Sequence, residues 1–153
     1  MSTILVPIDF SGISTSVVRE AVQLARLSGG KLVLLHVIQP PAIPNDFGVV
    51  LDNFSVYTAA AEKNAERHLS LLREQLAKAG VDAEGVWVSG YPALCILEQA
   101  KKRSADYIVL GSHGHTAFYD LLVGSTATGV LRRASCPVII VPRAKKAARK
   151  AKA

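Results

Sequence analysis

The sequence predicts a single α/β domain in which helices cover both faces of a mostly parallel, five-stranded sheet, a three-layer α/β/α arrangement. The main observation is that short apolar runs alternate with segments of helical periodicity, in the order β-α-β-α-β-α-β-α-β. Strands joined through helices run parallel, by right-handed crossovers. Length and composition agree, because 153 residues, 50% of them hydrophobic and 20% charged, suit one domain with a buried core.

The first two predicted strands flank the first predicted helix. The strands are short apolar runs, Thr3–Pro7 (TILVP) and Lys31–Ile38 (KLVLLHVI). The second run shows little alternation, as expected of a strand that is covered on both faces. Between them, Ser14–Leu27 places its apolar residues on one side, and Gly29 is a glycine of the kind that ends a helix.

A loop and a long helix lead to the third predicted strand. Residues 39–53 are rich in Pro and Gly and are interpreted as a loop. Tyr57–Ala79 then shows a long helical pattern, which Gly80 ends. The third strand follows at Glu84–Ser89 (EGVWVS).

The remaining elements alternate in the same way. Pro92 opens a helix, because proline is tolerated in the first turn, and the helical pattern runs to about Arg103. Tyr107–Leu110 (YIVL) is predicted as the fourth strand, Ser125–Arg133 as the last helix and Pro137–Val141 (PVIIV) as the fifth strand.

Composition argues against several classes of protein. Two cysteines are too few for a disulfide scaffold. No run approaches the eighteen consecutive apolar residues or so of a membrane-spanning helix, and the first ten residues lack the features of a signal peptide. We therefore expect a soluble, cytoplasmic protein that is not integral to a membrane.

The net charge of +6 is concentrated at the carboxyl end of the sequence. Residues 143–153 hold six basic residues and no acid, so the rest of the chain is balanced at 12 of each sign. This division predicts a domain over residues 1–143 and a basic, low-complexity tail over residues 144–153. Two interpretations of the tail stay open: a solvated, disordered segment, or an electrostatic contact with nucleic acid or an anionic surface.

The connection after the fourth predicted strand is unusually long and contains three glycines. Thirteen residues separate Gly111 from Ser125, whereas two to six or so is usual for such connections. The glycines at 111, 114 and 124 allow backbone N–H groups to approach a ligand closely. Ser125 and Thr126 can cap the helix or donate hydroxyls, and the helix N-terminus adds N–H groups and a positive dipole. These features favour a phosphate-binding loop over an ordinary surface loop.

Asp9 follows the first predicted strand and faces the same edge of the sheet. A carboxylate there could hold a ribose hydroxyl or a Mg²⁺ ion that bridges phosphates. The alternative is a cap on the first helix, a role for which Ser11 or Ser14 is better placed. Position alone leaves both interpretations open.

At these residues the sequence resembles the universal stress protein (UspA-like) family. The family's nucleotide-binding signature is Gly, two residues, Gly, nine residues, Gly, then Ser or Thr, and Gly111, Gly114, Gly124 and Ser125 match it completely. The blocks ILVPIDFS, LVLLHVI, YIVLGSHGHT and CPVIIVP are similar to family blocks in the same order, over about residues 1–143.

The resemblance implies an adenine nucleotide alpha-hydrolase-like fold with strand order 3-2-1-4-5, and ATP as the ligand. The sequence leaves ADP and AMP open as alternatives, and we expect Mg²⁺ to accompany the phosphates. The resemblance also implies a homodimer that pairs the last strands, Val138–Val141, which would cover an apolar sheet edge. The residues implied at the nucleotide, from adenosine to phosphates, are Pro7, Ile8, Asp9, Val37, Gly111, Ser112, His113, Gly114, His115, Thr116, Gly124, Ser125, Thr126 and Ala127.

The sequence departs from the family pattern at positions 113 and 115, which often carry Arg or Lys and here are both His. Unperturbed histidines are largely neutral near pH 7. Phosphate binding would therefore depend more on backbone donors and strengthen at lower pH.

Three functions are consistent with the sequence. The first is an ATP-binding, homodimeric regulatory module of the stress response. The second is a slow ATPase or autophosphorylating enzyme, although no second residue that would activate a water or a nucleophile is evident. The third is an interaction protein that acts through its basic tail.

Overall fold

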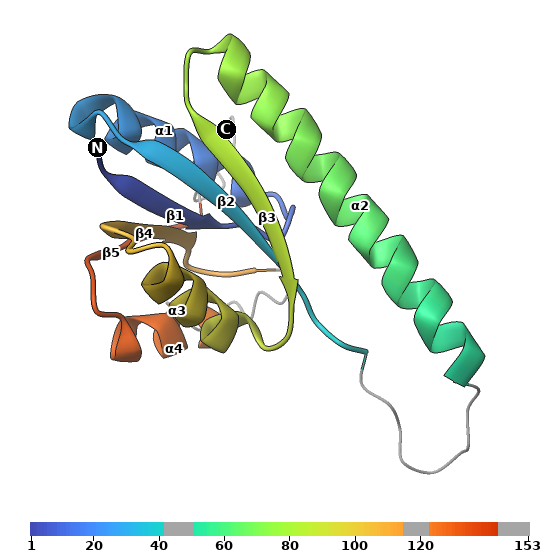
Figure 1. The fold of residues 1–153 in the computed structure, drawn as a ribbon. Helices are drawn as coiled ribbons and strands as arrows, with labels where there is room; N and C mark the ends of the chain where they lie inside the picture. The colour runs from blue at the N-terminus through green and yellow to red at the C-terminus, as the bar shows by residue number, and fades with distance from the viewer. Residues whose placement is uncertain (42–50, 115–122, 144–153) are drawn as a thin grey trace, which may run out of the picture.

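The computed structural model describes residues 1–41, 51–114 and 123–143, without the side chains of residues 51–54. Within these ranges the chain forms the predicted alternation of five strands and four helices (Figure 1). The elements are β1 (Thr3–Pro7), α1 (Ser14–Ser28), β2 (Lys31–Ile38), α2 (Leu51–Lys78), β3 (Ala83–Ser89), α3 (Pro92–Lys102), β4 (Tyr107–Gly111), α4 (Ser125–Arg133) and β5 (Val138–Val141).

The sheet confirms the predicted architecture. Its strands are all parallel and lie in the order β3-β2-β1-β4-β5. Thr3 lies opposite Lys31 in β2, and Ile4 lies opposite Tyr107 in β4. The chain therefore winds one way from β1 to β3 and the other way from β4 to β5, with the switch point between β1 and β4.

Alternating side chains divide the core into two layers. In β1, Ile4 and Val6 pack toward α1 and α2, whereas Leu5 packs toward α3 and α4. The strands β2 and β4 alternate in the same way, because successive side chains of a strand point to opposite faces. Figure 1 shows the two pairs of helices on opposite sides of the sheet, with α2 running beside β3, diverging from it and extending past its end.

Residue chemistry accounts for the helix ends. Gly29 has φ +62° and donates its N–H to the Ala25 carbonyl, which closes α1 as the sequence predicts. Gly80 also has a positive φ, at +72°. Pro92 occupies the first turn of α3, also as predicted.

The start of α2 differs from the prediction. The helix begins at Leu51, whereas the sequence predicts a helix from Tyr57 and a loop over residues 39–53. The last glycine of that interval is Gly48 and the last proline is Pro44. No strong helix breaker follows Gly48, so the helix extends further back than its apolar periodicity indicates.

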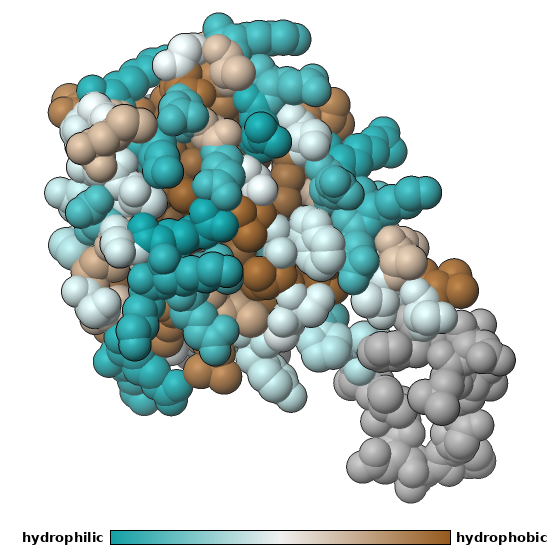
Figure 2. All heavy atoms as spheres, in the orientation of Figure 1, coloured by the Kyte–Doolittle hydropathy of each residue, from teal (hydrophilic) through white to brown (hydrophobic). Residues whose placement is uncertain are grey.

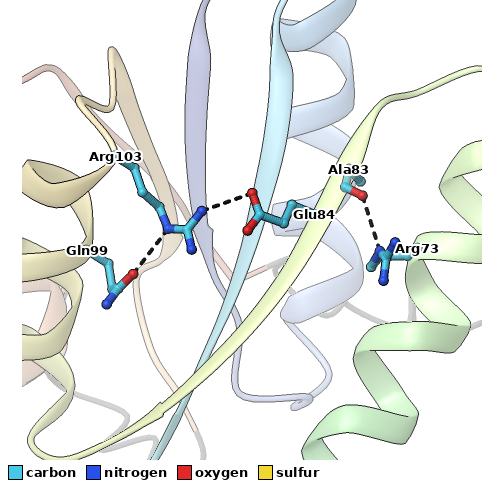
Figure 3. A network of polar contacts seen from close by, with 5 residues as sticks. All are labelled: Arg73, Ala83, Glu84, Gln99 and Arg103. Atoms are coloured by element: carbon cyan, nitrogen blue, oxygen red, sulfur yellow. Dashed lines mark hydrogen bonds and ion pairs between the residues drawn. The ribbon is translucent and has the colours of Figure 1, made fainter.

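Polar contacts tie β3 to both layers of helices. Figure 3 shows Arg103, just after α3, bound to Glu84 of β3 at 2.9 Å and to Gln99 at 3.1 Å. From the other face, Arg73 of α2 donates to the Ala83 carbonyl at 3.3 Å.

Figure 2 shows hydrophilic side chains over the outer side of α2 and over α3 and α4, with hydrophobic ones between them. Among the described residues, no helix is both long enough and apolar enough to cross a membrane.

Candidate functional site

The candidate site lies at the carboxyl ends of β1 and β4. Because these two strands pair directly, Pro7 and Gly111 end at the same edge of the sheet. The segments that follow them, together with the start of α4, contain most of the residues singled out in the sequence. Ligands of doubly wound sheets bind at this kind of switch point.

Asp9 is held by the turn that leads into α1. Its Oδ1 accepts hydrogen bonds from the Ser11 N–H at 2.9 Å, the Ser11 hydroxyl at 2.5 Å and the Ser14 hydroxyl at 3.2 Å. The helix begins after Ile13, which makes no side-chain cap bond. None of the three candidate caps therefore caps α1, because both serine hydroxyls point to Asp9 and orient its carboxylate.

Gly114 approaches Asp9 so closely that no side chain fits between them. A Cβ added to Gly114 would lie 2.7 Å from the Asp9 Oδ2 atom, a distance that real Cβ atoms essentially never show. The segment after β4 thus folds back onto the segment after β1. These two segments, which the sequence assigns to one site, are therefore in contact.

Ser112 connects the glycine segment to its surroundings. It is only 4% exposed. Its N–H donates to the Val141 carbonyl at 2.9 Å, and its own carbonyl accepts the Gly124 N–H at 2.6 Å. Its hydroxyl shares a hydrogen bond of 2.9 Å with Nδ1 of His113. The ends of β4 and β5 and the start of α4 are therefore bound to one another through one residue.

The start of α4 presents backbone donors to this edge. Gly124 is the N-cap residue, in an extended conformation, and no side chain caps the helix. The proposed cap by Ser125 or Thr126 is therefore not formed, because Gly124 itself precedes the helix and binds Ser112. The first N–H groups of an α-helix have no intrahelical acceptor, and they carry the positive end of the helix dipole. An anion is the ligand that such a helix start favours.

The other predicted site residues lie beside this contact or outside the described residues. Ile8 is buried and donates its N–H to the Leu35 carbonyl at 2.8 Å. Val37 lies one residue before the end of β2, opposite Val88, and is half-buried. His115 and Thr116 fall among residues 115–122, outside the described ranges.

Phe10 has a structural role that the sequence did not reveal. Its φ is +59°, in the left-handed region that bulky residues rarely adopt. Its ring lies 4.6 Å from that of His36 on β2 and 4.8 Å from that of His68 on α2, measured between centroids. The His36 Nδ1 atom lies 3.0 Å from the Ile8 carbonyl oxygen. These contacts hold the turn that carries Asp9, and no sequence motif signals a positive φ at phenylalanine.

Two shallow grooves lie away from this edge, one between α2 and β3 beside Arg73 and one between α3 and α4 beside Lys101. In the described parts of the chain, no three His, Cys, Asp or Glu residues are grouped as metal ligands would be. The segments that follow β1 and β4 are therefore the candidate site that agrees with the glycine motif of the sequence.

The strand order defines a doubly wound α/β protein, and the glycine segment places its candidate site at the switch point of the sheet. The model of the universal stress protein family matches residues 1–142, and the chain belongs to this family. Universal stress protein YxiE of Bacillus subtilis is 32% identical over 142 residues, which cover 90% of this chain and 96% of that protein.

The solved structures that this chain resembles are also universal stress proteins. Universal stress protein UspA from Lactobacillus plantarum has a TM-score of 0.82 and 27% identity, over 92% of this chain and 97% of that one. A universal stress protein in complex with cAMP has a TM-score of 0.63 and 27% identity, over 92% and 96%. The universal stress protein from Archaeoglobus fulgidus in complex with dAMP has a TM-score of 0.62 and 25% identity, over 92% and 97%.

Proposed function

We propose that this universal stress protein binds an adenine nucleotide, ATP in the first place, at the carboxyl ends of β1 and β4. The contact between Gly114 and Asp9 carries the proposal, because it joins a carboxylate to the glycine segment that leads to the start of α4. The relatives solved with cAMP and dAMP support an adenine nucleotide as the ligand class. ADP and AMP share the adenosine part and are candidates for the same site.

Each part of the site suits a part of the nucleotide. Pro7, Ile8, Asp9 and Val37 would lie at the adenosine, with the Asp9 carboxylate as an acceptor for ribose hydroxyls. The N–H groups at the start of α4 would hold the phosphates. The proposed phosphate and ribose residues are Gly111, Ser112, His113, Gly114, His115, Thr116, Gly124, Ser125, Thr126 and Ala127.

Mg²⁺ fits this site only if phosphate oxygens of the nucleotide supply part of its ligands. The ion needs about six oxygen ligands and is commonly bound by one or two carboxylates together with phosphates and waters. Asp9 is the carboxylate in the described part of the site, and its Oδ1 already accepts three hydrogen bonds. Bound Mg²⁺ would offset phosphate charge beside Asp9.

We propose a homodimeric regulatory module in the cytoplasm rather than a fast enzyme. β5 lies at the edge of the sheet, and its residue Ile139 is 38% exposed, so a second copy pairing along Val138–Val141 would cover it. Asp9 and His113 are the described titratable groups next to the phosphate segment, and the hydroxyls of Ser11, Ser14 and Ser112 bind them. Hydrolysis would then be slow enough for the bound nucleotide to act as a signal.

Titration calorimetry with ATP, ADP, AMP and GTP tests this function. Asp9→Asn keeps an oxygen for the Ser11 and Ser14 donors but removes the charge, and we expect about tenfold weaker binding of ATP. Asp82→Asn is the matched control, because Asp82 is an exposed carboxylate just before β3, at the opposite edge of the sheet. Absence of binding by the unmodified protein would refute the proposed function.

A further inference from the structure

The hydrogen bonds between β1 and β2 stop beside the candidate site, in the middle of a step. Pro7 lies opposite Leu35, and the Ile8 N–H donates to the Leu35 carbonyl at 2.8 Å. If this parallel ladder continued by one step, Ile8 would lie opposite His36, and the Val37 N–H would donate to the Ile8 carbonyl. Among the described residues that bond is not formed, so the last step of the ladder is only half completed.

A side chain takes the place of the missing backbone donor. The Nδ1 atom of His36 lies 3.0 Å from the Ile8 carbonyl oxygen. A carbonyl oxygen can only accept a hydrogen bond, so Nδ1 must carry the proton and donate. Ile8 is only 6% exposed, and a buried carbonyl without a donor costs free energy. The His36 ring therefore satisfies the Ile8 carbonyl without any contribution from Val37.

The turn after Ile8 prevents the ladder from resuming. Phe10 has φ +59°, which no residue of a β-strand adopts. Its ring lies 4.6 Å from the His36 ring and 4.8 Å from the His68 ring of α2, measured between centroids. His36 thus contacts the residue before Asp9 through Nδ1 and the residue after Asp9 through its ring. One side chain of β2 holds the backbone on both sides of Asp9.

The orientation of the Val37 backbone follows from its neighbours in β2. The Leu35 carbonyl bonds toward β1, where it accepts the Ile8 N–H, whereas the Ile38 carbonyl bonds toward β3, where it accepts the Gly90 N–H at 3.0 Å. Successive residues of a strand bond to opposite sides, so Val37 bonds to the same side as Leu35. Its N–H is directed at the space that β1 leaves after Ile8, beside the proposed adenosine position.

We propose that His36 is a positioning residue, which keeps the Val37 N–H available to a ring nitrogen of adenine by replacing it as the donor to the Ile8 carbonyl. This inference rests on the proposed function. The ring nitrogens of a purine accept hydrogen bonds, so a backbone N–H that is not used in the sheet is a suitable partner for the base. Without the donor of His36, the Ile8 carbonyl would bind the Val37 N–H, and the ladder would close over the adenosine end of the site.

Amide hydrogen exchange measured by NMR, without nucleotide, tests this substitution of donors in the full protein. His36→Phe keeps a ring against Phe10 but has no donor, whereas His36→Asn keeps an N–H donor at the position of Nδ1 but loses the ring. The Val37 amide should exchange about tenfold more slowly in His36→Phe than in the unmodified protein, although the variant is less stable overall. In His36→Asn the exchange rate should return to within about twofold of the unmodified protein.

Calorimetry with ATP and AMP tests the consequence for binding. His36→Phe should bind both nucleotides about tenfold more weakly, and by the same factor, because the lost hydrogen bond is at the base and not at the phosphates. His36→Asn should bind both within about threefold of the unmodified protein. The control is Leu76→Val, which removes a methylene from a buried residue near the end of α2 and should leave both affinities unchanged.

The outcomes separate the inference from the function on which it rests. Exchange of the Val37 amide that is equally fast in His36→Phe and in the unmodified protein would overturn the inference. An ATP affinity of His36→Phe equal to that of the unmodified protein would also overturn it, as would an equal loss in Leu76→Val, and the nucleotide site would stand. If the unmodified protein bound neither ATP nor AMP, the proposed function itself would be overturned.

Discussion

Replacing Gly114 by Ala tests the contact on which the site is built. The added Cβ would lie 2.7 Å from the Asp9 Oδ2 atom and 3.8 Å from its Cγ atom. The carboxylate cannot move away freely, because the Ser11 N–H, the Ser11 hydroxyl and the Ser14 hydroxyl all bind its Oδ1. The substitution should therefore strain the turn after β1 and separate it from the segment after β4.

The expected loss of stability follows from these contacts. Overpacking of a closely fitted contact costs about 1–3 kcal/mol. For a domain of this size, each kcal/mol lowers the melting temperature by about 2–4 °C, so a fall of about 2–12 °C is expected. Circular dichroism and urea unfolding without nucleotide measure both quantities, and calorimetry should show weaker ATP binding.

A matched control and a double variant separate this effect from a general effect of alanine. A Cβ on Gly12 would meet no atom within 4 Å, so Gly12→Ala should change the free energy of unfolding by no more than about 0.5 kcal/mol. In an Asp9→Ala background, Gly114→Ala should cost little, which gives a coupling of about 1 kcal/mol or more. Equal stability of the two glycine variants would refute the close contact.

Three further predictions test other parts of the structure. Phe10 has φ +59°, a conformation that glycine adopts without strain, so the free energy of unfolding measured in urea should be about 1 kcal/mol higher for Phe10→Gly than for Phe10→Ala, although both variants lose the ring. The reverse order would show that the backbone is not strained there. Burial raises the pKa of the Cys95 and Cys136 thiols above the ordinary value of 9.0. The folded state therefore keeps these protons at a pH at which the unfolded state loses them, so the free energy of unfolding should fall as pH rises through and above that value. In a variant with alanine at both positions, the free energy of unfolding should fall less over the same pH range. Arg103→Ala should cost about 1 kcal/mol in urea unfolding, and a double-mutant cycle with Glu84→Ala should give a coupling of about 0.2–1 kcal/mol that salt reduces; no coupling would mean that the ion pair adds nothing.

Much of the fold is predictable because its signals are local. Apolar runs covered on both faces mark β1 and β2, whose bounds match the prediction, and Gly29 ends α1 as predicted, in a left-handed conformation. The start of α2 at Leu51 was not predicted, because its first turn lacks apolar periodicity and only the absence of a helix breaker permits it.

The sequence singles out residues for a candidate site but does not give their geometry. The spacing of Gly111, Gly114 and Gly124 indicates close backbone approaches, yet it does not say what each glycine approaches. Gly114 lies against Asp9, and Gly124 binds Ser112. Contacts between residues so distant in sequence depend on the packing of β1 beside β4. The positive φ of Phe10 likewise depends on rings from two other elements.

The nucleotide content of the purified protein tests the proposed function most directly. The protein is purified without added nucleotide and denatured with acid, and the supernatant is analysed by ion-exchange chromatography with mass detection. We expect an adenine nucleotide close to one per chain, with ATP predominant if hydrolysis is slow. A protein that releases no nucleotide and binds no ATP by calorimetry would contradict the function proposed for the contact between Asp9 and the glycine segment.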